Sequence, residues 1–323
     1  LIFEYFDESC GDAPTALRAA VDGVRALRYG ENPHQRGWFF GNFESMFDQL
    51  HGKEISYNNL LDIDAATALI AEFDKNLATF AVIKHNNPCG LACRDTVLEA
   101  WRAALAGDPV SAFGGVIVTN STIDADTATE IDKIFFEVII APAYSGEALD
   151  ILRRKKNRII LVQKQDNNAR TTMRSALGGV LVQERDNRTE STEDLRTVTA
   201  TAPTAAQVDD MLFAAKVVKH CRSNAIVLAH ARTLCAAGVG QTSRVDSLRQ
   251  AIAKAQAFGM TLDGAVMASD AFFPFGDCVK IAHEAGITAV IQPGGSIRDH
   301  ESVEYCDAHG MAMSMTGIRH FRH

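Results

Sequence analysis

The sequence lacks any long apolar run, which argues against a membrane-spanning helix. No segment of its 323 residues approaches the roughly 18 uninterrupted apolar residues that such a helix needs. The first ten residues, LIFEYFDESC, lack the basic start and apolar centre of a secretory signal. We therefore expect a cytoplasmic protein with no membrane partner. The first residue is Leu rather than Met, which is compatible with a fragment or processed form of a longer product.

Disulfide and metal patterns are also missing. The seven cysteines are scattered, odd in number and form no CxxC pair, so we expect reduced thiols. Zinc deaminases combine H-x-E with P-C-x-x-C, but here Pro88-Cys89 is followed by Cys93, one residue too far, and no H-x-E occurs. HExxH, G-x-S-x-G and Walker loops are absent as well. We therefore expect no catalytic metal.

An excess of positive charge is absent too. The net charge is −8 and the pI is about 5.7, which argues against a protein that coats nucleic acid, although a local basic pocket is compatible with these values. With 47% hydrophobic and 22% charged residues, the composition is that of an ordinary globular protein. A chain of 323 residues is long enough to form two lobes, each with its own hydrophobic core.

Strand and helix patterns alternate along the chain, and this alternation predicts an α/β fold with helices packed on a mixed or parallel sheet. The polar stretch 186–203 is predicted to link two lobes in which strands and helices alternate in a similar way. No convincing residue-level repeat supports a duplication, however. Helices are expected over 13–27, 61–73, 95–106, 124–134, 146–155, 205–221, 243–258, 278–285 and 297–308, and strands over 80–83, 138–141, 159–162, 225–229, 234–239, 266–268 and 289–292, with a turn entering a strand over 108–119.

The stretch that most suggests chemistry is TFAVIKHNNPCG, residues 79–90. Its apolar run indicates a buried strand that stops on Lys84 and His85, and the following Asn, Pro and Gly residues place these side chains at the rim of a sheet. A neighbouring ammonium disfavours imidazolium, so His85 would be neutral and able to take a proton near pH 7. From this stretch alone, a solvated strand end is an equally good interpretation.

Two polar stretches suggest recognition of a small anionic or amide ligand. Arg28-Tyr29 combines a guanidinium fork suited to phosphate or carboxylate with a stacking face, although for this stretch alone a surface Arg beside a packed Tyr is the preferred interpretation. Asn224 offers the donor and acceptor that an amide requires, or it marks a helix-ending turn.

Two glycine loops suggest anion sites. Residues 237–244 nearly match GxGxxG, but Ser243 replaces the last Gly, so the nicotinamide interpretation is weak and a generic anion site next to Arg244 is the better one. Residues 292–299 form a glycine turn with Ser296 expected as a helix N-cap. A simple capping turn remains the alternative for this second loop.

Two further stretches suggest the walls of a pocket. Residues 269–277 place three Phe between two Asp, which suits a wall for a planar ring or, alternatively, a buried turn. The basic terminus 319–323 is either a solvated tail or the closure of a pocket.

Taken together, these stretches resemble one family. LRYGENPHQ, EISYNNLLDIDAA, IKHNNPCG, DPVSAFGGVI, IIAP, SNAIV, GQTSR, SDAFFPF and PGGS occur in the order found in the AICAR transformylase domain of the bifunctional purine biosynthesis protein. The resemblance runs from about Leu27 to His323. Gly276 departs from it, since relatives often carry Arg there, and Arg322 lies in a tail that is often richer in His.

The resemblance implies formyl transfer from 10-formyltetrahydrofolate to the 5-amino group of AICAR, with no cyclohydrolase activity from this chain. It implies two tandem cytidine-deaminase-like lobes, each a three-layer α/β/α unit without catalytic zinc. Pro88-Cys89 is then expected to be a structural turn and not half of a zinc site. Residues 1–26 are then an extension, 27–195 the first lobe and 196–323 the second. The resemblance also implies a homodimer with its sites at the subunit interface.

The resemblance assigns roles to individual residues. His85 falls on the proton acceptor and Lys84 on the group that stabilises the transition state. The AICAR-contacting positions are Arg28, Tyr29, Gly114, Glu137, Asn224, Phe272 and Arg319, and the folate-contacting positions are Arg244, Asp277, Ser296 and Ile297.

Two alternatives remain open at this point. A zinc-dependent nucleoside deaminase could use the same fold, and an inactive purine-nucleotide sensor could keep the same pocket. The sequence leaves undecided whether folate or free formate is the donor, and which polyglutamate length is preferred.

Overall fold

The computed structural model of the chain describes residue 17 and residues 19–166 and 169–323. The first half contains β1 (Val24–Leu27), β2 (Gly37–Phe40), α1 (Phe43–Met46), β3 (Phe47–His51), α2 (Tyr57–Ile70), β4 (Ala78–Lys84), β5 (Asn87–Arg94), α3 (Val97–Gly107), β6 (Val116–Thr119), α4 (Ala125–Asp132), β7 (Val138–Ala141), α5 (Gly146–Leu152) and β8 (Ile159–Gln163). After the hairpin of β9 (Thr171–Ala176) and β10 (Gly179–Glu184) come β11 (Arg196–Thr197), α6 (Ala205–Lys219), β12 (Ile226–His230), β13 (Thr233–Gly238), α7 (Arg244–Ala257), β14 (Val266–Ser269), α8 (Asp277–Glu284), β15 (Ala289–Gln292), α9 (Asp299–Ala308) and β16 (Ala312–Met315).

A 12-stranded mixed sheet forms the centre of the protein, and its two halves repeat one topology. The strand order β3-β8-β7-β6-β4-β5 in the first half is matched by β11-β16-β15-β14-β12-β13 in the second. In each half an antiparallel hairpin is followed by three parallel strands, and an antiparallel strand closes the outer edge. The structure thus reveals a duplicated topology, whereas the sequence showed only a similar alternation of strands and helices in the two halves.

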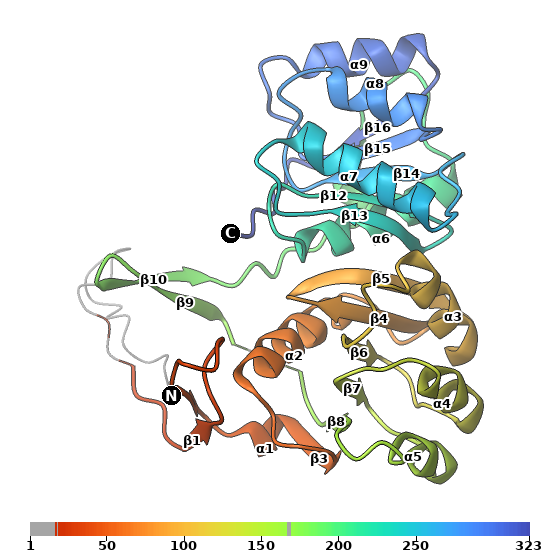
Figure 1. Cartoon of the computed structure of the whole chain (residues 1–323). Coiled ribbons are helices and arrows are strands. Elements are labelled where there is room, and N and C mark those ends of the chain that lie inside the picture. The colour runs from red at the N-terminus through yellow and green to blue at the C-terminus, as the bar shows by residue number, and fades with distance from the viewer. Residues whose placement is uncertain (1–16, 18, 167–168) are drawn as a thin grey trace.

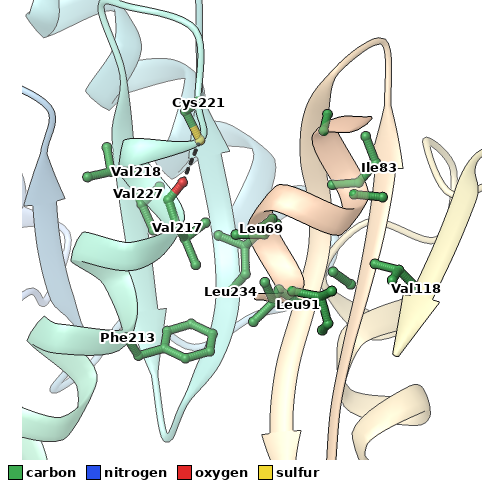
Figure 2. Packing of buried hydrophobic residues seen from close by; sticks show 14 of the residues in the cluster. Leu69, Ile83, Leu91, Val118, Phe213, Val217, Val218, Cys221, Val227 and Leu234 are labelled. Carbon is green, nitrogen blue, oxygen red and sulfur yellow. Dashed lines mark hydrogen bonds between the residues drawn. The ribbon is translucent and has the colours of Figure 1, made fainter. Parts of the chain in front are cut away.

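The two halves join where β5 and β13 pair antiparallel, with Thr233 opposite Ala92. On one face, α2 and α6 share a continuous apolar core with both halves of the sheet. Figure 2 shows Leu69 and Leu91 of the first half next to Leu234 of the second within this core. The junction is therefore a shared hydrophobic core, in addition to paired strands.

The opposite face of the sheet is covered separately in each half. Helices α3, α4 and α5 pack on the first half around Trp101, and α7, α8 and α9 pack on the second around Phe273 (Figure 1). Successive residues of β4 alternate between the faces, because Phe80 and Val82 contact this layer while Ala81 and Ile83 contact the shared core. The expected α/β fold in three layers is confirmed.

Three local expectations are wrong. Residues 24–27 form strand β1 rather than the end of a helix, because they pair with β2 over Val24↔Phe40 to Leu27↔Gly37. Pro88-Cys89 is a bulge within β5 rather than a turn, since Ile83 pairs with Pro88 and Val82 with Gly90. Residues 17 and 19–23 of this expected helix form no helix either, and its residues 13–16 and 18 lie outside the described residues.

The third error concerns Ser296, which is not a helix N-cap. Helix α9 begins later, at Asp299, with Arg298 at the N-cap position. The Asp299 carboxylate accepts the backbone N–H groups of Gly295 and Ser296, and so organises the glycine turn from its far side.

The β9–β10 hairpin was not expected, and it projects away from the sheet (Figure 1). Its side chains are mostly exposed, including Val180 and Leu181. The separate β1–β2 sheet also exposes large apolar groups, Trp38 and Phe40. No helix within the described residues has both the length and the apolar character needed to cross a bilayer.

Candidate functional site

Most of the candidate residues lie along one edge of the sheet. Because β13 runs antiparallel to β5, the end of β13 lies on the same side as the tip of the β4–β5 hairpin. The start of β12 and the ends of β14, β15 and β16 share this edge within the second half. The candidate residues that flank these strand ends come from both halves of the chain.

Lys84 and His85 lie at the tip of the β4–β5 hairpin. Lys84 ends β4, and its Nζ donates hydrogen bonds to the carbonyl oxygens of Phe113 at 3.0 Å and Gly114 at 2.9 Å. His85 is exposed and has φ of 50°, followed by Asn86 with φ of 63°, so two left-handed residues form the turn. The chain therefore leaves strand geometry at His85, as both side chains would need in order to serve one site.

The backbone of Gly114 lies directly against the side chain of Lys84. It has φ of +69°, and a Cβ built on it would lie 3.0 Å from Lys84 Nζ. Glu137 is close by, because its backbone N–H donates to the carbonyl of Gly115 at 3.0 Å. Its carboxylate pairs with Lys53 at 2.5 Å. The structure thus brings Lys84, Gly114 and the backbone of Glu137 into one neighbourhood.

Asn87 links this tip to the second half of the chain, a role that the sequence reasoning missed. Its side-chain amide donates to the His85 carbonyl at 2.9 Å and its oxygen accepts the Arg222 backbone N–H at 3.1 Å. Arg222 is two residues before Asn224. One side chain therefore spans from the turn that carries His85 to the segment that carries Asn224.

Asn224 is part of a buried polar network centred on Arg244. Arg244 Nη2 donates to Asn224 Oδ1 at 2.9 Å and to Asp270 Oδ1 at 2.7 Å, and Nη1 donates to the Phe272 carbonyl at 3.2 Å. The Asn224 amide nitrogen donates to the Gln241 carbonyl at 3.0 Å. Arg244 and Asp270 are almost fully buried, so in this state Arg244 acts first as an internal organiser of the loops.

A pocket of about 320 Å³ opens beside this network. Arg244 and Asp277 both line it, together with Asn224, Thr242, Ser243, Val245, Pro274, Phe275 and Cys278. Its rim reaches the loop of Ser296 and Ile297, because the guanidinium of Arg298 lies 4.6 Å from the centre of the Phe275 ring. Ile297 is 98% exposed and therefore free to contact a ligand. The four residues expected to contact folate thus surround one region of the second half.

The C-terminal segment passes along the same edge. His320 donates its backbone N–H to the Asp270 carbonyl at 3.0 Å, which brings the preceding Arg319 beside the Arg244 network. The exposed Arg319 guanidinium lies 4.6 Å from the centre of the Phe321 ring. The terminus is therefore packed against the edge and is not a solvated tail.

His320 is a buried residue whose importance the sequence reasoning missed. Its Nδ1 lies 2.6 Å from Asp186 Oδ2 and its Nε2 lies 3.0 Å from Glu190 Oε1. Burial alone would lower the pKa of His320, but hydrogen bonds with Glu190 and Asp186 outweigh it and raise that pKa above its ordinary value of 6.5. The side chain ties the C-terminal segment to the link between the halves.

Arg28 and Tyr29 come from a segment outside the central sheet. They follow β1 of the small two-stranded sheet, and Arg28 Nη2 donates to the Tyr29 hydroxyl at 2.8 Å. The nearby Glu31 carbonyl accepts a hydrogen bond from Asn58 at the start of α2. The contacts described for Arg28 and Tyr29 join them to each other and not to Lys84 or Asn224.

The part of the chain that the structure describes contains no recognisable set of metal ligands. Among these residues, no group of three or more His, Cys, Asp or Glu side chains is arranged to hold a metal ion. Cys89, the closest approach to a zinc motif in the sequence, is surrounded by protein, and burial raises the pKa of its thiol to about 12.

Comparison with known proteins gives a consistent picture. Residues 1–254 match the family model described as AICARFT/IMPCHase bienzyme. The chain is 63% identical over 322 residues to the bifunctional purine biosynthesis protein PurH of Bacteroides thetaiotaomicron, covering 100% of this chain and 62% of the relative. It is 49% identical to the PurH of Chlorobium phaeobacteroides, covering 97% of this chain and 61% of the relative. The corresponding protein of Aquifex aeolicus is 50% identical over 305 residues, covering 93% and 60%. The chain thus spans about three fifths of the length of these relatives.

Proposed function

The chain belongs to the AICARFT/IMPCHase bienzyme family, and we propose that it catalyses the AICAR formyltransferase reaction. In this proposal the 5-amino group of AICAR attacks the formyl carbon of 10-formyltetrahydrofolate. The bond between that carbon and folate N10 then breaks, giving formyl-AICAR and tetrahydrofolate. The reaction would be the penultimate step of de novo IMP biosynthesis, carried out in the cytoplasm.

The observation that carries the proposal is the geometry of the β4–β5 tip. Lys84 Nζ has three N–H donors, and two of them are directed at the carbonyls of Phe113 and Gly114. The third is available for the oxyanion that develops on the formyl oxygen. Preorganised donors of this kind typically contribute about 10² to 10³ in rate. The two fixed hydrogen bonds hold the ammonium in place, so that little reorganisation is needed during the reaction.

His85 is proposed as the proton acceptor. The amine of AICAR is a weak nucleophile, because its lone pair is delocalised into the imidazole and the carboxamide. It must lose a proton as the new C–N bond forms, and a neutral imidazole at the exposed turn can accept it. Folate N10 takes up a proton as it leaves, so the overall transfer is balanced.

The remaining candidate residues are proposed to bind the two substrates. Asn224 is proposed to recognise the carboxamide of AICAR, which requires it to exchange its internal partners Arg244 and Gln241. Arg319 is proposed to bind the ribose phosphate. The residues proposed for AICAR are Arg28, Tyr29, Gly114, Glu137, Asn224, Phe272 and Arg319, and those proposed for folate are Arg244, Asp277, Ser296 and Ile297.

We further propose a homodimer with composite sites. Arg28 and Tyr29 follow β1 of the small sheet, and their described side-chain contacts are with each other and not with Lys84, so we propose that they complete a site across a subunit boundary. The exposed apolar groups of this sheet and of the projecting β9–β10 hairpin, such as Phe40 and Leu181, support burial against a second copy. The division of the chain at residues 195 and 196 into two lobes also remains a proposal, supported by the repeated strand order.

The test is a spectroscopic assay of tetrahydrofolate formation from AICAR and 10-formyltetrahydrofolate. His85→Ala is expected to lose at least 10²-fold in kcat, in line with the loss of a general base, while calorimetry still detects AICAR binding. His309→Ala, which removes an exposed imidazole after α9, serves as the control and should keep parental turnover.

Three outcomes would contradict the proposal. Turnover of His85→Ala within a few-fold of the parent would remove His85 from the mechanism. Stoichiometric zinc in the purified protein, with deamination of a nucleoside, would favour the deaminase alternative. AICAR binding without any formyl transfer by the parent protein would favour the sensor alternative.

A further inference from the structure

The hairpin tip that carries His85 is built twice in this fold. In the repeated topology, the β12–β13 hairpin of the second half occupies the place of β4–β5 in the first. The two turn residues of the first tip, His85 and Asn86, have φ of 50° and 63°. Those of the second tip, Ala231 and Arg232, have φ of 48° and 52°. Both tips therefore use two consecutive left-handed residues, and neither contains glycine.

Such turns require support from outside. Two-residue hairpin turns of this kind favour Asn-Gly or Gly-Gly, because a side chain on a left-handed residue costs about 1 kcal/mol. At the first tip, His85 occupies a position where Gly or Asn would fold more easily. The hairpin must therefore be stabilised by contacts that compensate for this residue choice.

An aspartate from a packed helix supplies this support at both tips. Asp62 of α2 accepts the backbone N–H of Asn86 at 2.7 Å. Asp210 of α6 accepts the N–H groups of Ala231 at 2.8 Å and Arg232 at 2.6 Å. Helices α2 and α6 are counterparts in the repeat, so the same device holds the same turn in each half.

Of the two aspartates, Asp62 is the one that lies beside Lys84 and His85, the pair proposed for catalysis. Burial raises the pKa of Asp62, while the Asn86 N–H and the charges of His85 and Lys84 oppose this rise. The Asp62 carboxylate, which contacts the residue after His85, is thus close enough to interact with the Lys84 ammonium and with an imidazolium at His85. At the second tip, the residue that corresponds to His85 is Ala231, which has no side-chain charge to share with Asp210.

We propose that Asp62 is a positioning residue for His85, acting both through the backbone of the turn and through its negative charge. The inference rests on the proposed formyl transfer. When the AICAR amine forms its bond to the formyl carbon, its proton moves to the His85 imidazole, which becomes a cation. The hydrogen bond to Asn86 fixes the direction of the ring, and the Asp62 carboxylate stabilises the positive charge that the ring acquires.

Four variants separate these contributions. Asp62→Ala removes the acceptor and the charge, whereas Asp62→Asn retains an oxygen acceptor and removes only the charge. Asp210→Ala and Asp210→Asn serve as controls at the second tip, where both carboxylate oxygens accept N–H groups, so Asp210→Asn also removes one of the two acceptors. A misplaced catalytic group can reduce the rate by about 10²-fold, and this is the fall in kcat expected for Asp62→Ala. The KM for AICAR should stay within a few-fold of the parental value.

Asp62→Asn should show a smaller fall in kcat than Asp62→Ala, since it keeps the hydrogen bond to the turn. Both Asp210 variants should keep kcat within about twofold, although their thermal stability should fall at least as far as that of the Asp62 variants, because Asp210 accepts two backbone N–H groups and Asp62 one. A kcat for Asp62→Ala equal to that of Asp210→Ala would overturn the inference. So would a rise in KM alone, because this would indicate a role only in binding.

A second measurement keeps this inference distinct from the proposed function. The backbone ¹H–¹⁵N resonance of Asn86 reports the hydrogen bond to Asp62 without any turnover, and it should shift in Asp62→Ala but not in Asp210→Ala. If the parent protein is active but the Asn86 resonance of Asp62→Ala is not shifted, the role of Asp62 is overturned and the proposed function is not. A parent protein that forms no tetrahydrofolate would overturn the proposed function, and the catalytic role of Asp62 with it.

Discussion

Glu72 offers the sharpest test of how the two halves are held together. It follows α2 in the first half, and its Oε1 lies 2.7 Å from Lys219 Nζ and 3.0 Å from His220 Nε2, both at the end of α6. The Thr189 hydroxyl of the link donates to Oε2 at 2.5 Å. All of these groups are largely shielded from solvent, and Lys219 is only 7% exposed. We predict that Glu72→Gln weakens the junction substantially.

The magnitude follows from the pKa of the carboxyl group. Burial alone would raise the pKa of Glu72, but hydrogen bonds from His220, Lys219 and Thr189 outweigh it and lower the pKa from 4.5 to about 2. This difference corresponds to about 3 kcal/mol of stabilisation of the folded state. Burial lowers the pKa of His220, so Lys219 supplies the positive charge at neutral pH. The substitution leaves that ammonium buried without a counter-charge, which typically costs about 3–5 kcal/mol.

The pH dependence gives the sign of the effect. A lowered carboxyl pKa contributes its full stability above pH 4.5, and this contribution is lost as the pH falls towards 2. The difference in unfolding free energy between parent and Glu72→Gln should therefore be about 3 kcal/mol at neutral pH. It should shrink by about 1 kcal/mol near pH 3.5.

The measurement is equilibrium unfolding in urea, followed by the fluorescence of the buried Trp101. Glu130→Gln is the control, because Glu130 forms its ion pairs with Lys133 and Arg102 at the surface, and the stability should not change measurably. A loss below about 0.5 kcal/mol for Glu72→Gln, or a difference that grows as the pH falls, would refute the reasoning.

Two further predictions concern packing and the C-terminal segment. Gly90→Ala should lower stability by about 1–3 kcal/mol in thermal denaturation, because the new Cβ would lie 2.2 Å from the Ala104 carbonyl; Gly146→Ala, where no atom lies within 4 Å, should be neutral. For His320→Gln, the raised pKa of the parent imidazole means that its ion pair with Glu190 stabilises the fold fully below pH 6.5 and is lost as the pH rises through the folded-state pKa. The parent should therefore exceed His320→Gln in thermal stability most clearly at acidic pH, and an advantage that grows above neutrality would contradict this role.

The alternation of strands and helices could be predicted because the central strands are continuous apolar runs. Segments such as Val138–Ala141 and Ala289–Gln292 are buried along their whole length, so their residue types alone indicate a buried strand. Strand β5 was harder to recognise, because Pro88 and Gly90 usually interrupt regular structure. The fold accommodates Pro88 at a bulge, and it requires Gly90 where α3 passes over the strand.

The candidate chemistry could be predicted from short motifs, but its spatial organisation could not. The pair Lys84-His85 and the amide Asn224 were recognisable as residue types at strand ends. Their proximity depends on the pairing of β5 with β13 and on the Asn87 bridge, contacts made across more than a hundred residues of sequence. Likewise, the apolar spacing before Arg28 suggested a helix, because nothing local reveals that β1 pairs with β2.

The repeat also suggests how the two halves divide the proposed reaction. Each half places its hairpin tip at one edge of the sheet and the ends of its parallel strands at the opposite edge. Because the halves join through antiparallel strands, the His85 tip of the first half lies at the same edge as the strand ends of the second, whereas the Ala231 tip lies at the opposite edge. In the proposed function, the first half supplies the proton acceptor and the oxyanion donor, and the loops of the second half supply most of the substrate recognition. Of the two equivalent tips, only the first carries a histidine next to such loops. We therefore expect catalysis at a single edge of the sheet in each chain, even though the fold is duplicated.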